Sequence, residues 1–285
     1  MKYLLVALVV AAQAVGNGVS AQTVPNTLGK IKSAKAITVA YSGDSLPFSF
    51  TDNNEPAGYS IDLCKRVIAQ IARAVGQPNL KINWVAGTTP ERLAMVAGGK
   101  ADLECANTTQ TLARLANVDF SALIFIDSGG FLIRSDAKVD RVADMGGKKI
   151  AVLKGTTTET RLRDTLQRRL VNATVVPIGQ ASEGMAMLEA STVDAYAGDK
   201  VKLVGLAAQA QDPAKFALMA EDLSYEPYAM ALPRNDSALR LEVNRALSQI
   251  YVSGEIEPII AQWMGKLGRP SGLLTAMYLL NTIPE

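Results

Sequence analysis

The chain alternates twice between strand and helix signals, and this alternation limits the folds it can adopt. The first unit comprises strands at 37–40, 80–85 and 101–105 and helices at 61–75 and from Thr89. The second unit comprises strands at 149–153, 173–178 and 193–197 and helices at 158–170 and 182–190. Two β-α-β-α-β units in succession predict an α/β protein in which each unit is a mostly parallel sheet flanked by helices.

Two further segments link the units into a two-lobed arrangement. An extended apolar segment with a glycine pair, 120–134, leads from the first unit to the second, and a strand signal at 225–232 leads back to two C-terminal helices. We therefore expect two lobes joined by two hinge crossings, with a cleft between them. The expected division is a signal peptide at 1–21, lobe 1 at 22–128, lobe 2 at 129–226, and a return to lobe 1 at 227–285.

The N-terminus has the features of a secretory signal. Lys2 precedes an apolar run that ends near Val15, and small residues lead to a cleavage site after Ala21. Because this run is shorter than the roughly 20 residues that span a bilayer, we expect a cleaved signal and a periplasmic protein without stable membrane insertion. The formal net charge of +2 gives no basic surface for nucleic acid.

Histidine is absent from the chain, whereas two cysteines are present. No Ser-His-Asp or Cys-His nucleophile system and no histidine-ligated zinc site can be built, and we expect neither metal nor cofactor. Cys64 and Cys105 meet oxidising conditions after export, where a pair can close a disulfide. Two buried free cysteines are the alternative, and the sequence alone does not decide between them.

Polar residues at the ends of corresponding strands are the first candidates for a binding site. Asn107 and Thr109 continue the strand at 101–105, Arg114 follows, and Asp199 occupies the matching place in the second unit. Open α/β sheets bind ligands beyond the carboxyl ends of their strands. Hydroxyls and a guanidinium suit a carboxylate, and Asp199 suits an ammonium group, so together they fit a zwitterion. Taken singly, each is explained as well by a polar turn or a surface side chain.

Thr156 opens a predicted helix and forms the sequence pattern of a capping box with Glu159. Exposed N–H groups and the helix dipole at this place attract an anion, and capping alone is the alternative interpretation. The terminal Gly-Lys-Ser/Thr of a Walker loop is missing, which argues against a nucleotide site.

Short motifs over nearly the whole mature chain match, in order, those of a known family. They are LPFSF (46–50), GYSIDLC (58–64), RLA (92–94) with GKADLEC (99–105), GTTTE (155–159) and SGE (253–255). The chain thereby resembles the family 3 extracellular solute-binding proteins, which are periplasmic amino-acid-binding components of ABC importers. The region around Arg92 and the DLEC run is most similar to the glutamate/aspartate-binding subgroup.

The resemblance implies roles for the strand-end residues. Arg114 would grip the ligand α-carboxylate with help from Thr109 and the backbone near Asn107. Asp199 would bind the α-ammonium group. These roles agree with the zwitterion trap inferred from the residues alone.

The resemblance also reaches the side-chain end of the cleft, where the chain departs from the subgroup. Thr156 and Thr157 would donate from the second lobe, and Arg92 stands where the subgroup directs an arginine toward the side-chain carboxylate. Ser42 replaces a second arginine of that subgroup, and Ala181 replaces a histidine. Because an underpaired buried charge is costly, the loss of two cationic contacts makes a neutral polar amino acid at least as good a candidate as an acidic one.

The function that the resemblance implies is a monomeric periplasmic binding protein, not an enzyme. It would close on a polar or acidic L-amino acid and present it to an inner-membrane ABC permease and its ATPase. One alternative is an exported enzyme on the same fold, such as a cyclohexadienyl or arogenate dehydratase, with Glu104 or Arg92 as acid or base. The other is a ligand-binding component of a sensor.

Overall fold

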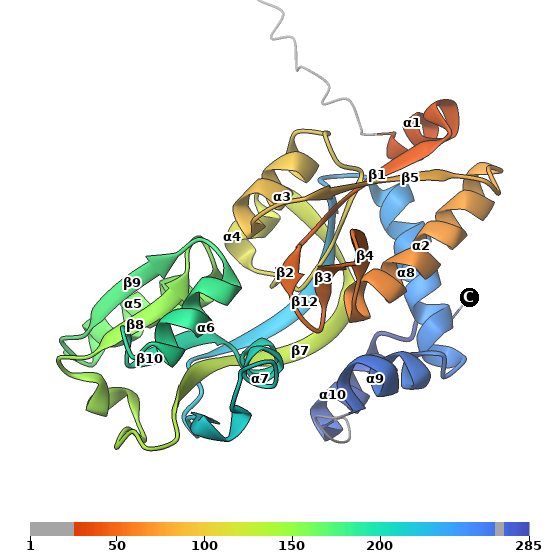
Figure 1. Cartoon of the computed structure of the whole chain (residues 1–285). Helices are drawn as coiled ribbons and strands as arrows, with labels where there is room; N and C mark the ends of the chain where they lie inside the picture. Colours follow the sequence, from red (N-terminus) through yellow and green to blue (C-terminus); the bar gives the residue numbers. More distant parts are fainter. Residues whose placement is uncertain (1–25, 266–270, 285) are drawn as a thin grey trace, which may run out of the picture.

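The computed structural model describes residues 26–265 and 271–284, so the predicted signal peptide at 1–21 lies outside it. Two lobes are linked by two long strands that run side by side between them (Figure 1). Within the described ranges, no helix combines the length and apolar character needed to cross a membrane. The expected two-lobed α/β architecture is confirmed.

One continuous sheet passes through both lobes in the order β5-β1-β6-β12-β7-β10-β8-β9, with β11 paired to β7. Its lobe 1 strands are β1 (Ala36–Tyr41), β5 (Lys81–Ala86) and β6 (Leu103–Cys105). Its lobe 2 strands are β8 (Lys149–Leu153), β9 (Thr174–Ile178), β10 (Ala195–Asp199) and β11 (Phe216–Leu218). The linking strands are β7 (Val118–Arg134) and β12 (Ser224–Pro233).

Pairing within each lobe is mostly parallel, as the alternating pattern predicts. In lobe 1, β1 is parallel to both β5 and β6, and in lobe 2, β8 is parallel to both β9 and β10. A separate small antiparallel sheet in lobe 1 contains β2 (Asp44–Ser45), β3 (Ser49–Asp52) and β4 (Glu55–Ala57). These strands have two to four residues each, too few to produce a readable alternation, and they were not predicted.

Helices cover the sheet in both lobes. Those of lobe 1 are α1 (Thr27–Ala34), α2 (Tyr59–Val75), α3 (Thr89–Ala97), α4 (Leu112–Leu115), α8 (Ser237–Val252), α9 (Ile256–Met264) and α10 (Gly272–Leu280). Those of lobe 2 are α5 (Thr157–Arg168), α6 (Ala181–Glu189) and α7 (Lys200–Ala207), with 3₁₀ turns at Val142–Met145 and Pro213–Lys215. Among them, α1, α4, α7 and α10 had no counterpart in the sequence prediction.

The two crossings form a hydrogen-bonded ribbon and not two separate linkers. β7 is 17 residues long and pairs antiparallel with β12 from Val118 opposite Pro233 to Gly129 opposite Ser224. The ladder shifts register on either side of Ala229. The polar residues that follow β6 and β10 lie beside this ribbon, which positions them at the junction of the lobes.

A disulfide ties α2 to the sheet of lobe 1. Cys64 and Cys105 are bonded with their Cα atoms 6.0 Å apart, which decides the alternative that the sequence left open. Both residues are fully buried in the main core cluster. The same core holds Phe48, whose ring packs edge-on against Phe125 and Tyr228.

The last strand of the first unit is shorter than predicted. β6 begins at Leu103 and not at 101, because the Thr38 N–H of β1 donates to the Asp102 carboxylate at 2.8 Å and not to a backbone carbonyl of this segment. Lys30 of α1 donates to the same carboxylate at 2.8 Å. Asp102 therefore joins α1 to the sheet, and its side chain points away from the strand-end site.

Candidate functional site

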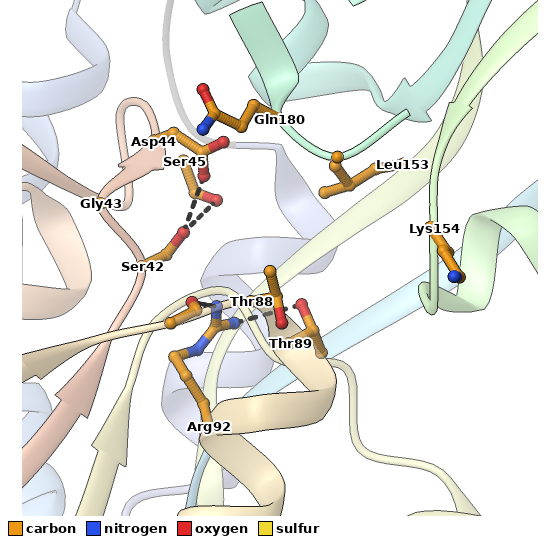
Figure 2. A pocket seen from close by; sticks show the side chains of 12 residues that line it. Ser42, Gly43, Asp44, Ser45, Thr88, Thr89, Arg92, Leu153, Lys154 and Gln180 are labelled. Atoms are coloured by element: carbon orange, nitrogen blue, oxygen red, sulfur yellow. Dashed lines mark hydrogen bonds between the residues drawn. The ribbon is translucent and has the colours of Figure 1, made fainter. Parts of the chain in front are cut away.

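The lobes face one another across a cavity of about 310 Å³ (Figure 2). Lobe 1 supplies the loop after β1 and the N-terminal turn of α3, and lobe 2 supplies the segments after β8 and β9. The lining residues are Ser42, Gly43, Asp44, Ser45, Gly87, Thr88, Thr89, Arg92, Leu153, Lys154, Gly179 and Gln180. A volume of this size is at the lower end of the range for small-molecule sites.

Asp199 lies beside this cavity, at the carboxyl end of β10, and accepts only neutral donors. Its Oδ2 accepts from Asn107 Nδ2 at 3.1 Å and from the Tyr228 hydroxyl at 2.7 Å, and its Oδ1 accepts from Thr158 Oγ1 at 3.1 Å. Within the described residues no cation forms an ion pair with it. The fold thus gives this half-buried carboxylate neutral hydrogen-bond donors but no ion-pair partner within the described residues.

Arg114 is a cation whose hydrogen-bond donors are mostly unused. Its Nη1 donates to the Thr109 carbonyl at 2.7 Å, and its other side-chain N–H groups have no hydrogen-bond partner among the described residues. Burial lowers the pKa of Arg114, while the carboxylates of Glu104, Glu226 and Asp199 act in the raising direction. A guanidinium remains charged through such a shift, so Arg114 offers unused donors to an anion.

Glu226 of β12 joins the two lobes at the predicted site, and the sequence analysis missed it. Its Oε2 accepts from Thr109 Oγ1 of lobe 1 at 2.5 Å and from Thr157 Oγ1 of lobe 2 at 2.8 Å. The residue is 1% exposed. Burial, followed by the charge of Asp199, raises the pKa of Glu226. The hydroxyls of Thr109 and Thr157, which were expected to donate to a ligand carboxylate, therefore donate to Glu226 instead.

Asp127 on the other linking strand completes a group of carboxyls around Tyr228. Its oxygens accept from the Ser128 N–H at 2.8 Å and the Val201 N–H at 3.1 Å. Burial, with the nearby charge of Asp199, raises the pKa of Asp127 to about 7. The junction between the lobes is thus rich in acidic groups.

Arg92 is brought to the cavity wall, but its hydrogen bonds are directed into the protein. Its Nε donates to Glu104 at 2.8 Å and its Nη1 to the Gly87 carbonyl at 2.8 Å, and Nη2 lies 3.3 Å from Thr89 Oγ1 and 3.2 Å from Thr108 Oγ1. The side chains of Arg92 and Glu104 are 2% and 0% exposed. The positive charge is matched by a buried partner, so this arginine presents little uncompensated charge to the cavity.

Thr156 and Ser42 direct their hydroxyls to groups of the protein itself. Thr156 caps α5, since its Oγ1 accepts from the Glu159 N–H at 3.2 Å and donates its proton to the Leu153 carbonyl at 2.7 Å. Ser42 is buried and bonds with Ser45 Oγ at 2.8 Å and Asp44 Oδ1 at 3.1 Å (Figure 2). The capping interpretation of Thr156 is confirmed, and its side chain has no second proton to donate to a ligand.

The chain matches the profile of the bacterial extracellular solute-binding proteins, family 3, over residues 37–266. It belongs to this family. Relatives at moderate identity cover most of its length. The L-glutamate/L-aspartate-binding protein of Pseudomonas aeruginosa is 30% identical over 257 residues, which are 90% of this chain and 85% of that protein. The ABC transporter glutamine-binding protein of Bacillus subtilis is 26% identical over 248 residues, 86% of this chain and 87% of that protein.

Solved structures share the fold of this family 3 protein. The cysteine-binding protein from Campylobacter jejuni superposes with a TM-score of 0.73 at 24% identity, over 85% of this chain and 94% of that one. An ancestral amino acid-binding protein described as a precursor of cyclohexadienyl dehydratase gives 0.71 at 25% identity, over 84% and 99%. Both confirm the two-lobed architecture.

The functional residues divide into those that the sequence located and those that it missed. Asn107, Thr109 and Asp199, located by their places at strand ends, meet at the lobe junction together with Thr157, which the resemblance had named. The sequence placed Glu226 in a return strand but gave it no role at the site, because the alternation of a strand does not tell which neighbour a polar side chain contacts. Residue spacing gave no signal for the pairing of Asp44 with the first N–H of α6, at Ala181, which lies 137 residues away.

Proposed function

We propose that this protein binds an L-α-amino acid between its lobes as the extracytoplasmic substrate-binding component of an ABC importer. The ligand α-ammonium group would bind Asp199, and its α-carboxylate would bind Arg114. The observation that carries the proposal is the pair of unmatched charges described above. Asp199 has neutral donors only, and Arg114 has N–H groups without partners among the described residues.

The balance of charges at the junction favours a ligand with an amine. Arg92 is matched by Glu104, which leaves Arg114 as the remaining guanidinium facing Asp199 and Glu226. A positive group bound at Asp199 relieves the repulsion that raises the pKa of Glu226 and Asp127. A simple dicarboxylate without an amine would add to that repulsion instead.

Closure of the lobes supplies the signal that the importer reads. Direct contacts already join the lobes at several points, including Asn107 to Asp199 at 3.1 Å and Thr109 to Thr157 at 3.4 Å. A ligand held by Arg114 of lobe 1 and Asp199 of lobe 2 would add two charged contacts to this set. Hinge closure around a ligand is a common mechanism in such two-lobed proteins, and a permease with its ATPase would recognise the closed form.

An enzymatic role on the same fold is less well supported. The two acid or base candidates, Glu104 and Arg92, are bonded to one another, and Glu104 also accepts from Thr108 Oγ1 at 2.7 Å. Glu104 is fully buried, and its Oε1 is occupied by protein donors, whereas a general acid or base has to lie within hydrogen-bond reach of the reacting proton.

The proposal is tested by thermal unfolding of the purified protein with each common amino acid, followed by calorimetry on the ligands that stabilise it. A ligand at 100 times its Kd stabilises the native state by about 2.7 kcal/mol. Arg114→Ala and Asp199→Asn are each expected to weaken binding by about 2–5 kcal/mol, roughly 30-fold or more.

Two exposed substitutions, Arg240→Ala and Asp212→Asn, serve as matched controls and should leave affinity unchanged. Wild-type protein that no amino acid stabilises would refute the proposal. Undiminished affinity in both Arg114→Ala and Asp199→Asn would refute the assignment of the site.

A further inference from the structure

The cavity beside the amino-acid site is placed to receive the ligand's side chain. Leu153 lines both this cavity and the small hollow of about 20 Å³ that contains Asp199. Because Leu153 is part of both walls, we take the cavity as the space that the side chain of a ligand bound at Asp199 would enter. The inference below rests on the proposed function and concerns which side chains this space accepts.

Asp44 is the carboxylate that lines this cavity, and it connects the two lobes. Its Oδ1 accepts from Ser42 Oγ at 3.1 Å in lobe 1, and its Oδ2 accepts from the Ala181 N–H at 2.9 Å in lobe 2. Ala181 is the first residue of α6, whose N-cap residue, Gln180, makes no side-chain cap hydrogen bond. Asp44 thus supplies from lobe 1 the cap that α6 lacks in its own lobe.

Capping by Asp44 removes an anion site from the cavity. The N-terminus of α6 would otherwise present N–H groups and the positive end of a helix dipole to a ligand carboxylate. With Asp44 bound there, the first of these N–H groups is occupied, and a negative charge stands at the helix N-terminus. A ligand carboxylate in the cavity would meet repulsion from Asp44.

The positive groups of the cavity do not cancel this effect. Arg92 is neutralised by Glu104 at 2.8 Å and directs its N–H groups to protein acceptors. Lys154 is exposed, and Figure 2 shows its ammonium group on the far side of the cavity from Asp44. The other polar groups on the wall are uncharged, namely the hydroxyls of Ser42, Ser45, Thr88 and Thr89 and the amide of Gln180.

We propose that Asp44 determines side-chain specificity, and that it makes the cleft select an uncharged, hydrogen-bonding amino-acid side chain over a carboxylate. Hydroxyl and amide groups on the wall satisfy such a side chain in either direction, as donors or as acceptors. Asp44 is bonded to both lobes only while the lobes are closed, because its two partners, Ser42 and Ala181, lie on opposite lobes. It therefore excludes a carboxylate only in the closed form. Specificity and closure are therefore coupled through one residue.

The test compares acid and amide ligands of matched shape by calorimetry: L-glutamate with L-glutamine and L-aspartate with L-asparagine, together with the best ligand from the thermal screen. Wild-type protein is expected to prefer an uncharged ligand over either acid by at least about tenfold. Asp44→Asn keeps the shape and one acceptor oxygen, and it should raise the affinity for an acid relative to the best uncharged ligand by about tenfold.

The control is Asp52→Asn, the same substitution at an exposed position of the same small sheet, which should leave the ratio unchanged. The inference is overturned if the best wild-type ligand is an acidic amino acid, or if Asp44→Asn shifts the ratio by less than threefold. Either result, obtained while Arg114→Ala still weakens binding at least about 30-fold, leaves the proposed function intact. Failure of every amino acid to bind wild-type protein overturns both.

Discussion

The variant Arg92→Met tests whether Arg92 stabilises the fold or binds the ligand. The Arg92 and Glu104 side chains are 2% and 0% exposed and 2.8 Å apart, so Arg92→Met leaves a buried carboxylate without its cation. Breaking a buried pair by removing one partner costs about 3–5 kcal/mol. For a chain of this size, about 2–4 °C of Tm corresponds to each kcal/mol, which predicts a fall of roughly 6–20 °C.

Two further variants make this prediction specific. The double variant Arg92→Met with Glu104→Met should regain most of the lost stability, because it removes the uncompensated charge as well. Arg168→Ala removes an ion pair of similar length, 2.9 Å, whose side chains are 65% and 42% exposed. Such exposed helical pairs contribute about 0.5 kcal/mol or less, so this control should shift Tm by no more than about 2 °C.

The assay is thermal unfolding of all variants without ligand, with calorimetry on the best ligand afterwards. If Arg92→Met unfolds within about 2 °C of wild type and loses its ligand affinity, the reasoning from burial is wrong. Arg92 would then be a ligand-binding residue, as the resemblance implied. A double variant no more stable than the single one would argue against the buried charge as the cause.

Two other predictions follow from the lobe 1 core and from the hinge. The disulfide closes a loop with a sequence separation of 41, so its reduction, or the double substitution Cys64→Ala with Cys105→Ala, should lower the free energy of unfolding by about 4 kcal/mol. The measurement is a lower Tm, and an unchanged Tm would contradict the prediction. Burial raises the pKa of Asp127 to about 7 from 3.8, so the folded state binds this proton more tightly and stability should fall as pH rises between these values. The Tm of Asp127→Asn minus the Tm of wild type should therefore be higher at about pH 8 than at about pH 5. A difference in Tm that does not change with pH would refute this.

Elements with a long, clear period were predictable from the sequence. α2 was expected over 61–75 and spans Tyr59–Val75, and β8 was expected over 149–153 and occupies that range. The start of α2 depends on Gly58, which has a φ of 123°. A Cβ atom at this position would lie 2.4 Å from the Phe48 carbonyl oxygen, so no other residue fits there without strain. Periodicity predicts the helix, and the glycine determines where it begins.

Side-chain direction was the part that the sequence did not determine. Arg92 was expected to face a ligand because the resemblance implies that role, but Glu104, 12 residues further along the chain, forms a buried ion pair with it. Thr109 was expected to donate to a ligand, but Glu226 accepts its proton from 117 residues away. Both departures arise from tertiary partners that no local pattern specifies.

The ribbon of β7 and β12 also sets an order of assembly. The strands β8, β9 and β10 lie between them in sequence, so the core of lobe 2 is available as one uninterrupted stretch. Lobe 1 depends instead on contacts between the two ends of the chain, such as the Thr27 N–H to Asp236 Oδ2 at 3.0 Å and the hydroxyls of Tyr59 and Tyr278 at 2.8 Å. When the chain emerges with its N-terminus first, lobe 2 can finish before α8 is available to cover the apolar face of α2. Lobe 1, whose first segment emerges before lobe 2, is therefore the lobe completed last.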